Sequence, residues 1–314
     1  WSVFYQVVNV GGFLGPILAG VMRLMAWRYV FISCAIIIAF NFLLLLTFPE
    51  PEREDVQAQV DAEPGFFAAI LRFVKVFWDS LIGIFEPRLA AFLVVFSGFW
   101  AMFHQLFDLL PNYISDWVDT SMIVSAVAAP LFSLFGQGVP EGWHGQIPPE
   151  QMINVNAGMC MLLAFIIGYY TGKVRSMTAM IAGILVAGGA IYSLGLTTNG
   201  WVTLGAIAVF SLGELMSSPT KMRYFASIAP PGKEATYLGY INATGGIGWA
   251  LGSLIAGEMY DQGGDKIVLA RRHLVDVLGQ PAQAIADMPK TEVMPKLAAL
   301  TEQSTQAAQT LLYN

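Results

Sequence analysis

The chain has 314 residues, of which 56% are hydrophobic and only 12% are charged. Soluble domains carry about 25% charged residues, so this composition indicates an integral membrane protein. The net charge of −6 comes with no basic stripe, which argues against a nucleic-acid partner. Cys34 and Cys160 both fall in apolar runs, where cysteine behaves as a small buried side chain, so we expect neither a disulfide nor a metal site.

A membrane-spanning helix needs about 20 mostly apolar residues. Seven segments of the chain meet this requirement: 3–22, 29–48, 89–112, 154–172, 177–198, 201–219 and 237–260. Trp1 begins the chain in the middle of an apolar pattern, so we expect a fragment whose earlier helices lie upstream. The sequence therefore predicts an all-α integral membrane protein with about seven transmembrane helices.

Residues 49–88, between the second and third spans, are predicted to form a linker. The segment is charged at first, and then apolar residues recur at steps of three or four from Phe66 to Phe85, with Arg72 and Lys75 on the opposite face. This pattern predicts an amphipathic helix on the membrane surface. The alternative is a solvent-exposed helix that packs on the protein.

Lysine and arginine are distributed unevenly among the connecting loops. If Trp1 faces the cytoplasm, nine of these residues fall in cytoplasmic connections: Arg53, Arg72, Lys75, Arg88, Lys173, Arg175, Lys221, Arg223 and Lys233. This bias predicts a multi-pass protein of the inner (plasma) membrane in that orientation. Lys221 and Arg223, at the inner end of their helix, are expected to snorkel to the lipid headgroups.

Two further segments would then lie on the outer side. Residues 113–153 form a long outer loop, whose apolar piece Met122–Phe135 is too short to span and is expected to be interfacial or re-entrant. Residues 261–314 are Ala/Gln-rich and helix-prone, and are interpreted as a polar tail or an extracytoplasmic insertion.

Glu214 lies near the end of an otherwise apolar stretch and is followed by Ser217-Ser218-Pro219, which we expect to break the helix. A carboxylate at this depth costs about 2.5–3.5 kcal/mol on insertion scales. A role in holding a cation, a proton or an ammonium group in a water-filled cavity would explain that cost. The alternative is a structural salt bridge, or a protonated glutamate packed between helices.

Two pairs of glycines are spaced four residues apart within spans. Gly11 and Gly15 form one pair, and Gly248 and Gly252 form the other. This spacing puts each pair on one helix face and predicts close approach of another helix. The chain has no Walker A, H-E-x-x-H or G-x-S-x-G motif, which argues against direct ATP drive and the common hydrolases.

Four stretches resemble the proton-dependent oligopeptide transporter family, a branch of the major facilitator superfamily. Residues 4–13 resemble F-Y-x-x-I-N-x-G-[SGA] of its fifth helix, and residues 99–105 resemble F-W-x-x-[FY]-[DE]-Q of its seventh, with His104 in place of the acid. Residues 151–154 resemble the Q-x-[LI]-N that opens its eighth helix. Residues 213–219, followed by Ala229-Pro230, resemble G-E-L-x-x-S-P…A-P of its tenth.

The resemblance implies that the spans are helices five to eleven of a twelve-helix major facilitator bundle. Residues 1–48 would be the last two helices of the N-terminal bundle, 49–88 the cytoplasmic linker, and 89–260 the C-terminal bundle. The implied function is proton-coupled symport of di- or tripeptides by alternating access, with small peptides, protons and the bilayer as partners. This implied function uses the proton gradient as its energy source and needs no cofactor. It would make the protein a transporter and not an enzyme. Alternatives are a carrier for a drug, nitrate, a nucleoside or a sugar, or a non-transporting sensor or structural subunit.

The resemblance also implies roles for four residues. Glu214 would hold the peptide's amino terminus and take part in proton coupling, Asn9 and Asn154 would bond the peptide backbone, and Trp100 would shape the pocket. The alternative for both asparagines is an ordinary interhelical hydrogen bond.

His104 and Asp108 are four residues apart and therefore share a helix face, where they could relay protons near neutral pH. Asp108 lies close to the outer end of its span, so it could equally meet water. Together with Glu214, these two residues are the candidates for proton coupling.

Overall fold

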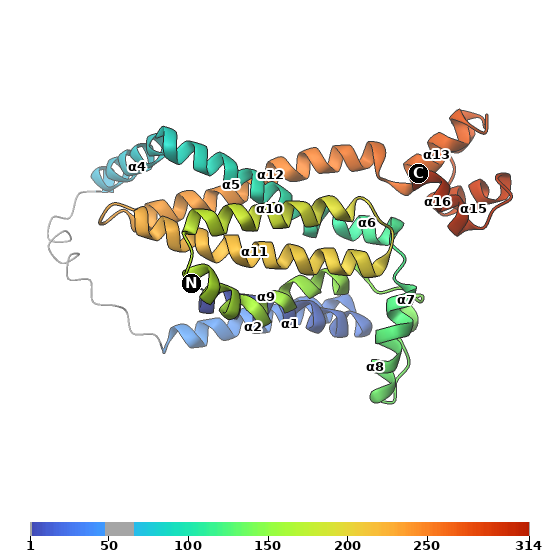
Figure 1. Ribbon diagram of the computed structural model, residues 1–314, viewed down its shortest axis with the longest axis horizontal. Helices are drawn as coiled ribbons and strands as arrows, with labels where there is room; N and C mark the ends of the chain where they lie inside the picture. Colours follow the sequence, from blue (N-terminus) through green and yellow to red (C-terminus); the bar gives the residue numbers. More distant parts are fainter. Residues whose placement is uncertain (1, 48–65, 314) are drawn as a thin grey trace. The chain divides into compact units, whose positions relative to one another are not determined.

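The computed structural model describes residues 2–47 and 66–313 (Figure 1). The chain divides into two compact units, one of Leu14–Val94 and one of Trp1–Phe13 with Val95–Asn314. The N-terminal residues up to Phe13 thus belong to the same unit as the long C-terminal part of the chain. Each unit is described separately.

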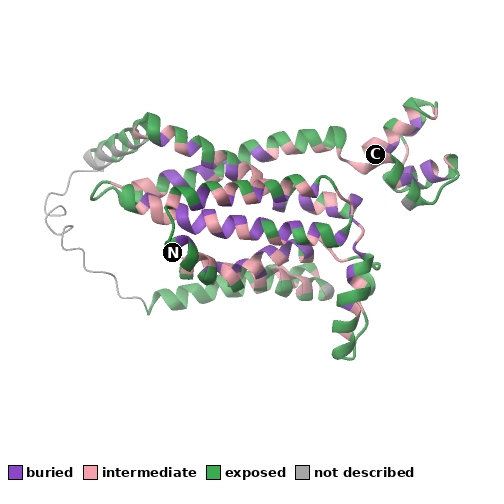
Figure 2. Ribbon diagram, in the orientation of Figure 1, coloured by how far each residue is buried: buried purple, intermediate pink, exposed green. Residues whose placement is uncertain are grey.

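The smaller unit holds the later part of α1 (Ser2–Met25), then α2 (Trp27–Leu45), α4 (Phe66–Gly83) and the first turns of α5 (Pro87–Asp108). No residue of α2 is buried, as expected of an apolar helix whose surroundings are lipid or other helices (Figure 2). The helix predicted between Phe66 and Phe85 is confirmed as α4. Its position on the membrane surface stays a prediction.

The larger unit contains the rest of α5 and the helices that follow it. These are α6 (Leu110–Trp117), α7 (Ser121–Ile123), η1 (Val124–Ala128), α8 (Ala129–Leu134), η2 (Glu141–Trp143), α9 (Pro149–Gly172), α10 (Ser176–Leu194), α11 (Gly200–Ile228), α12 (Glu234–Gly263), α13 (Lys266–Asp276), α14 (Ala282–Ala286), α15 (Lys290–Leu300) and α16 (Thr305–Tyr313). Helix α11 packs against α9, α10 and α12 and is the most buried of the long helices (Figure 2). Side chains on α11 are therefore the ones that reach the interior of this unit.

The helical membrane bundle that the sequence predicts is confirmed. Six helices in the described part of the chain are long and apolar enough to cross a membrane: α1, α2, α5, α9, α10 and α11. The seventh expected span, 237–260, lies within the 30-residue helix α12, which is not among the six. Glycine, hydroxyl and charged side chains dilute its apolar residues.

The expectation that Pro219 breaks its helix is wrong. Helix α11 continues through Pro219 to Ile228, and Pro219 lies among buried residues. A proline removes one backbone N–H, but in membrane helices packing and nearby serine side chains compensate. Ser217 Oγ donates to the carbonyl oxygens of Gly213 and Glu214, at 2.9 and 3.2 Å, whereas the carbonyl that loses its helical partner at Pro219 is that of Leu215. Burial of this stretch among neighbouring helices is therefore what keeps α11 continuous.

One of the two predicted glycine contacts is confirmed. A Cβ at Gly248 would overlap the carbonyl oxygen of Ser97, and a Cβ at Gly252 would lie 2.7 Å from that of Ala101. Helices α5 and α12 therefore approach closely enough to require glycine. A Cβ at Gly11 or Gly15 would meet no described atom within 4 Å, so the structure shows no close approach there.

Candidate substrate and coupling site

Glu214 lies on α11 with 2% of its surface exposed. The hydroxyl of Tyr5 on α1 donates to its Oε1, and Nδ2 of Asn156 on α9 donates to its Oε2 at 2.8 Å. Asn156 Nδ2 also lies 3.0 Å from Ser211 Oγ, one turn before Glu214. One carboxylate thus joins three helices through two hydrogen bonds, which are stronger for an ionised acceptor than for a neutral one.

The prediction that Glu214 lies in a water-filled cavity is wrong for this structure. The carboxylate is sealed from solvent, and protein donors reach both oxygens. An incoming ammonium group would have to displace Tyr5 or Asn156. The binding role of Glu214 stays a prediction.

The expectation that Lys221 snorkels to lipid headgroups is wrong. Lys221 lies seven residues after Glu214 on α11, about 10.5 Å further along the axis, and is 3% exposed. Its Nζ lies 3.8 Å from the ring centroid of Trp100 on α5. The indole face attracts the ammonium group, so the lysine has a partner in the protein interior.

Trp100 and His104 belong to a stack of three rings. The His104 ring lies 5.6 Å from that of Trp100, at 29°, and 5.1 Å from that of Trp249 on α12, at 21°. Trp249 Nε1 donates to Asp108 Oδ2 at 2.7 Å, and Ser253 Oγ donates to the same oxygen at 2.6 Å. The predicted pair of His104 and Asp108 is therefore linked through one indole, and its role in proton relay stays a prediction.

Both predicted asparagines bond to backbone of α1. Asn9 Nδ2 donates to the carbonyl of Tyr5 at 2.8 Å, within its own helix. Asn154 Nδ2 donates to the carbonyl of Phe13 at 3.1 Å, which matches the interhelical alternative. Asn154 Oδ1 is buried and has no hydrogen-bond partner in the described part of the chain. That oxygen leaves Asn154 able to accept a bond from a solute.

The sequence analysis assigns no role in this region to Tyr5, Asn156 or Trp249, and it predicts a different position for Lys221. Tyr5 falls in the F-Y pattern that carries the resemblance, and Asn156 is a polar residue within a span, so both gave a usable signal. Sequence alone predicts that Lys221 lies at the lipid interface, because its indole partner Trp100 is far away in the sequence. Trp249 gave no signal that distinguishes it from a packing residue.

No group of three or more His, Cys, Asp or Glu residues that could hold a metal ion occurs within 2–47 and 66–313. The side chains described in this region comprise two carboxylates, of Glu214 and Asp108, the Lys221 ammonium group, the His104 imidazole, aromatic rings and amides. Such a set can bind a charged or polar solute and exchange a proton.

Two comparisons with known proteins give a match to this chain. The family described as Major Facilitator Superfamily matches residues 1–253. The chain is 22% identical over 263 residues to the "Uncharacterized MFS-type transporter YdeE" of Escherichia coli (strain K12), covering 82% of this chain and 56% of that protein. The chain thus spans about half the length of the curated relative it matches. No solved structure matches.

Both matches point to a transporter and not an enzyme, and to a multi-pass membrane protein. Neither distinguishes the oligopeptide branch that residues 4–13 and 213–219 resemble. The family match covers four fifths of the chain, and the structure is a bundle of membrane-type helices. The chain therefore belongs to the major facilitator superfamily.

Proposed function

We propose that the chain is part of a secondary active transporter of the inner membrane that couples proton entry to the import of di- or tripeptides. The observation that carries the proposal is Glu214, a buried carboxylate on the most buried helix, held by Tyr5 and Asn156 from two other helices. A carboxylate inside a membrane is costly unless it has a function or a partner. Both of its partners here are neutral, so it can still accept a proton or pair with an ammonium group.

The contacts of Glu214 are of the kind that alternating access requires. Tyr5, Asn156 and Glu214 lie on α1, α9 and α11, which resemble the fifth, eighth and tenth helices of the oligopeptide transporter family. If the helices separate, the carboxylate loses one donor and becomes open to a solute cation. Protonation would weaken its hold on both donors, because hydrogen bonds to charged groups are stronger than those to neutral groups.

A second candidate keeps the transporter and changes its cargo. His104, which stands where the family has an acid, is stacked between the indoles of Trp100 and Trp249. The negative charge that the family has at this position is therefore replaced by an aromatic ring. This observation favours a drug-like or nucleoside cargo as the alternative.

Uptake into proteoliposomes of the full-length protein tests the proposal. We expect radiolabelled dipeptides to accumulate only when an inward proton gradient is imposed. Glu214→Gln should abolish gradient-driven accumulation, since the amide can neither take up a proton nor pair with an ammonium group. Glu234→Gln, which changes an exposed carboxylate at the start of α12, is the matched control and should transport normally.

The outcomes separate the candidates. No gradient-dependent uptake across a dipeptide panel would refute the peptide proposal, and uptake of a nucleoside or drug in the same vesicles would favour the alternative. Wild-type uptake by Glu214→Gln would leave Glu214 as a packing residue.

A further inference from the structure

The residues after α12 form a folded helical module. Helices α13–α16 enclose a hydrophobic core of their own, in which Leu274, Ile285, Val293 and Leu297 are at most 1% exposed. We call these four helices the C-terminal module. The segment expected to be a polar tail is therefore a structured part of the larger unit.

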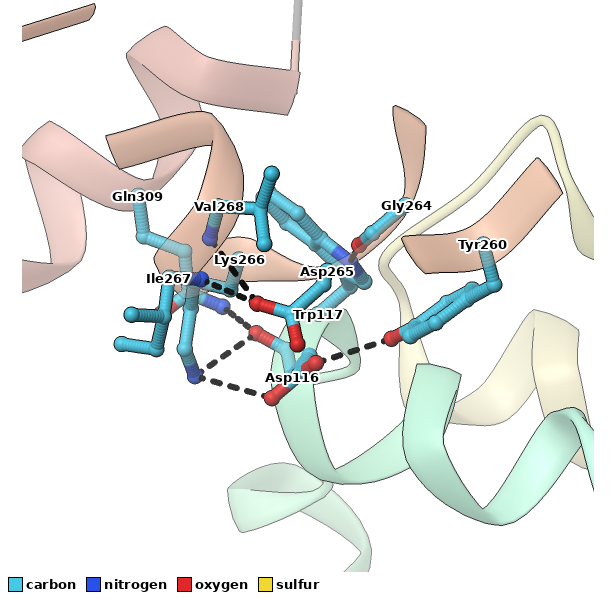
Figure 3. Close-up of polar contacts among 9 residues, drawn as sticks. All are labelled: Asp116, Trp117, Tyr260, Gly264, Asp265, Lys266, Ile267, Val268 and Gln309. Carbon is cyan, nitrogen blue, oxygen red and sulfur yellow. Dashed lines mark hydrogen bonds and ion pairs between the residues drawn. The ribbon is translucent and has the colours of Figure 1, made fainter. Parts of the chain in front are cut away.

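Asp116, near the end of α6, fastens the module to the bundle (Figure 3). The hydroxyl of Tyr260 donates to Asp116 Oδ2 at 2.8 Å, and Lys266 Nζ lies 3.6 Å from Oδ1. The backbone carbonyl of Asp116 accepts from Lys266 Nζ at 3.1 Å and from the side chain of Gln309 on α16. The ends of α6 and α12 and the last helix of the module thus meet at one residue.

Tyr313 makes a second attachment. Its hydroxyl lies 2.8 Å from that of Tyr113 on α6 and donates to the carbonyl of Gly195, between α10 and α11, at 3.1 Å. The Trp117 indole packs against the Tyr313 ring at 5.5 Å and donates to the backbone of Gly264 at 2.8 Å. These contacts hold α16 at a fixed position relative to the loops beside it.

A pocket of about 530 Å³ lies between α16, the end of α6 and the neighbouring loops. Its wall consists mainly of hydroxyl and amide side chains, among them Gln146, Thr305 and Gln309. Among the described residues that line the pocket, Asp119 is the one charged side chain, and none is a lysine or an arginine. Ligand pockets commonly have volumes of about 300–1,000 Å³, so this one can hold a small solute.

Asp119 is fixed in position by its neighbours. Its Oδ1 accepts from the backbone N–H of Ser121 at 2.9 Å and from Gln146 Nε2 at 3.1 Å. Gln146 is held in turn, because its Oε1 accepts from the backbone N–H and the hydroxyl of Thr120, at 2.6 and 2.7 Å. Hydrogen bonds from Ser121 and Gln146 keep the pKa of Asp119 below its usual range, so the carboxylate is ionised at neutral pH.

We propose that this pocket is a binding site for a small solute that carries an ammonium group. Asp119 would pair with the ammonium group, while the hydroxyl and amide side chains would bond the rest of the solute. A wall with one anion and no cation disfavours anionic solutes. One part of this proposal rests on the proposed function. If the protein carries peptides, the pocket would receive the amino terminus of the peptide before Glu214 does.

Ligand binding to the full-length protein in lipid nanodiscs tests the site. Glu214→Gln serves as the background, because it removes the deep carboxylate. Alanyl-alanine and 1,4-diaminobutane are the probes, and N-acetyl-alanyl-alanine is the probe without an ammonium group. We expect at least one amine probe to bind the background protein, the acetylated peptide to bind poorly, and Asp119→Asn to weaken amine binding at least about tenfold.

The controls separate binding from folding. Asp119→Asn keeps the Oδ1 acceptor for Ser121 and Gln146, so its thermal unfolding should match that of the background. Asp276→Asn changes an exposed carboxylate at the end of α13 and should leave binding unchanged. Thr305→Phe should weaken binding without altering charge, because it places a ring in the wall of the pocket.

Two results would overturn the proposal: no binding of either amine by the Glu214→Gln protein, or equal binding with and without Asp119→Asn. Asp119-dependent binding in a protein that fails to transport dipeptides would instead refute the proposed function and leave this site standing.

Discussion

Helix α11 carries two buried groups of opposite charge, and neither depends on a direct ion pair with the other. Glu214 has Tyr5 and Asn156 as donors, while Lys221 has the indole face of Trp100. A buried ion pair with good geometry is hard to break, because each partner would be left uncompensated. Neutral partners compensate each charge less completely, so a solute or a proton can replace them. The arrangement therefore suits a site that must bind and release.

Tyr5 provides a test at the residue scale. Tyr5→Phe removes the hydroxyl that bonds Glu214 and leaves a buried carboxylate oxygen unsatisfied. We expect the free energy of unfolding to fall by about 1–3 kcal/mol. Thermal denaturation of the detergent-solubilised protein measures the change. Tyr192→Phe, at a position 72% exposed on α10, is the matched control and should leave stability unchanged. Equal melting temperatures for both variants would show that the Tyr5 contact does not stabilise the fold.

Helices are the part of this protein that sequence predicts best. Runs of about 20 apolar residues predict the six membrane-type helices, and apolar residues at steps of three to four predict α4. Both predictions succeed because these signals are local in the sequence. The prediction of a break at Pro219 is wrong, because tertiary packing around this buried proline overrides a local preference. The contacts of the candidate site are less predictable, since Tyr5, Asn156 and Trp100 meet α11 from distant parts of the chain.

The glycines also show that contacts between distant parts of the chain are hard to predict from sequence. The four-residue spacing of Gly248 and Gly252 predicts a helix contact. The close approach of α10 and α11, by contrast, involves glycines that have no such spacing pattern. A Cβ at Gly183 would lie 2.6 Å from the carbonyl oxygen of Gly213, and a Cβ at Gly213 would lie 2.6 Å from the backbone nitrogen of Ala187. The place where α10 touches α11 is thus next to Glu214.

Gly183→Ala tests that contact at the scale of the element. The added methyl group must push α10 away from α11, and overpacking of this kind costs about 1–3 kcal/mol. Gly189→Ala, on the same helix, has nothing within 4 Å in the described structure, and alanine is the better helix former. We therefore expect the first variant to melt at a lower temperature than wild type and the second at the same or a higher temperature. If Gly183→Ala were as stable as Gly189→Ala, the close packing of α10 on α11 would be in doubt.

Across the larger unit, the loops separate into two groups. The end of α6, the turn between α10 and α11, and the C-terminal module are joined by Tyr113, Asp116 and Tyr313. At the other ends of the helices, Arg223 donates to the carbonyl of Thr171 at 3.3 Å, close to Lys173. The basic connection between α9 and α10 therefore lies at the opposite end of these helices from the turn between α10 and α11. This grouping agrees with the orientation that the lysine and arginine bias predicts.

Site-directed labelling tests this orientation for the whole molecule. Gln283→Cys lies on the module, and Lys173→Cys lies at the end of α9; both positions are exposed. Cys34→Ser provides the background, because Cys34 is exposed whereas Cys160 is buried. We expect a membrane-impermeant maleimide to label Gln283→Cys in intact cells and Lys173→Cys only after permeabilisation, because basic loops are retained in the cytoplasm. The reverse pattern would put the module and the Asp119 pocket in the cytoplasm. The pocket would then meet the solute where the transporter releases it.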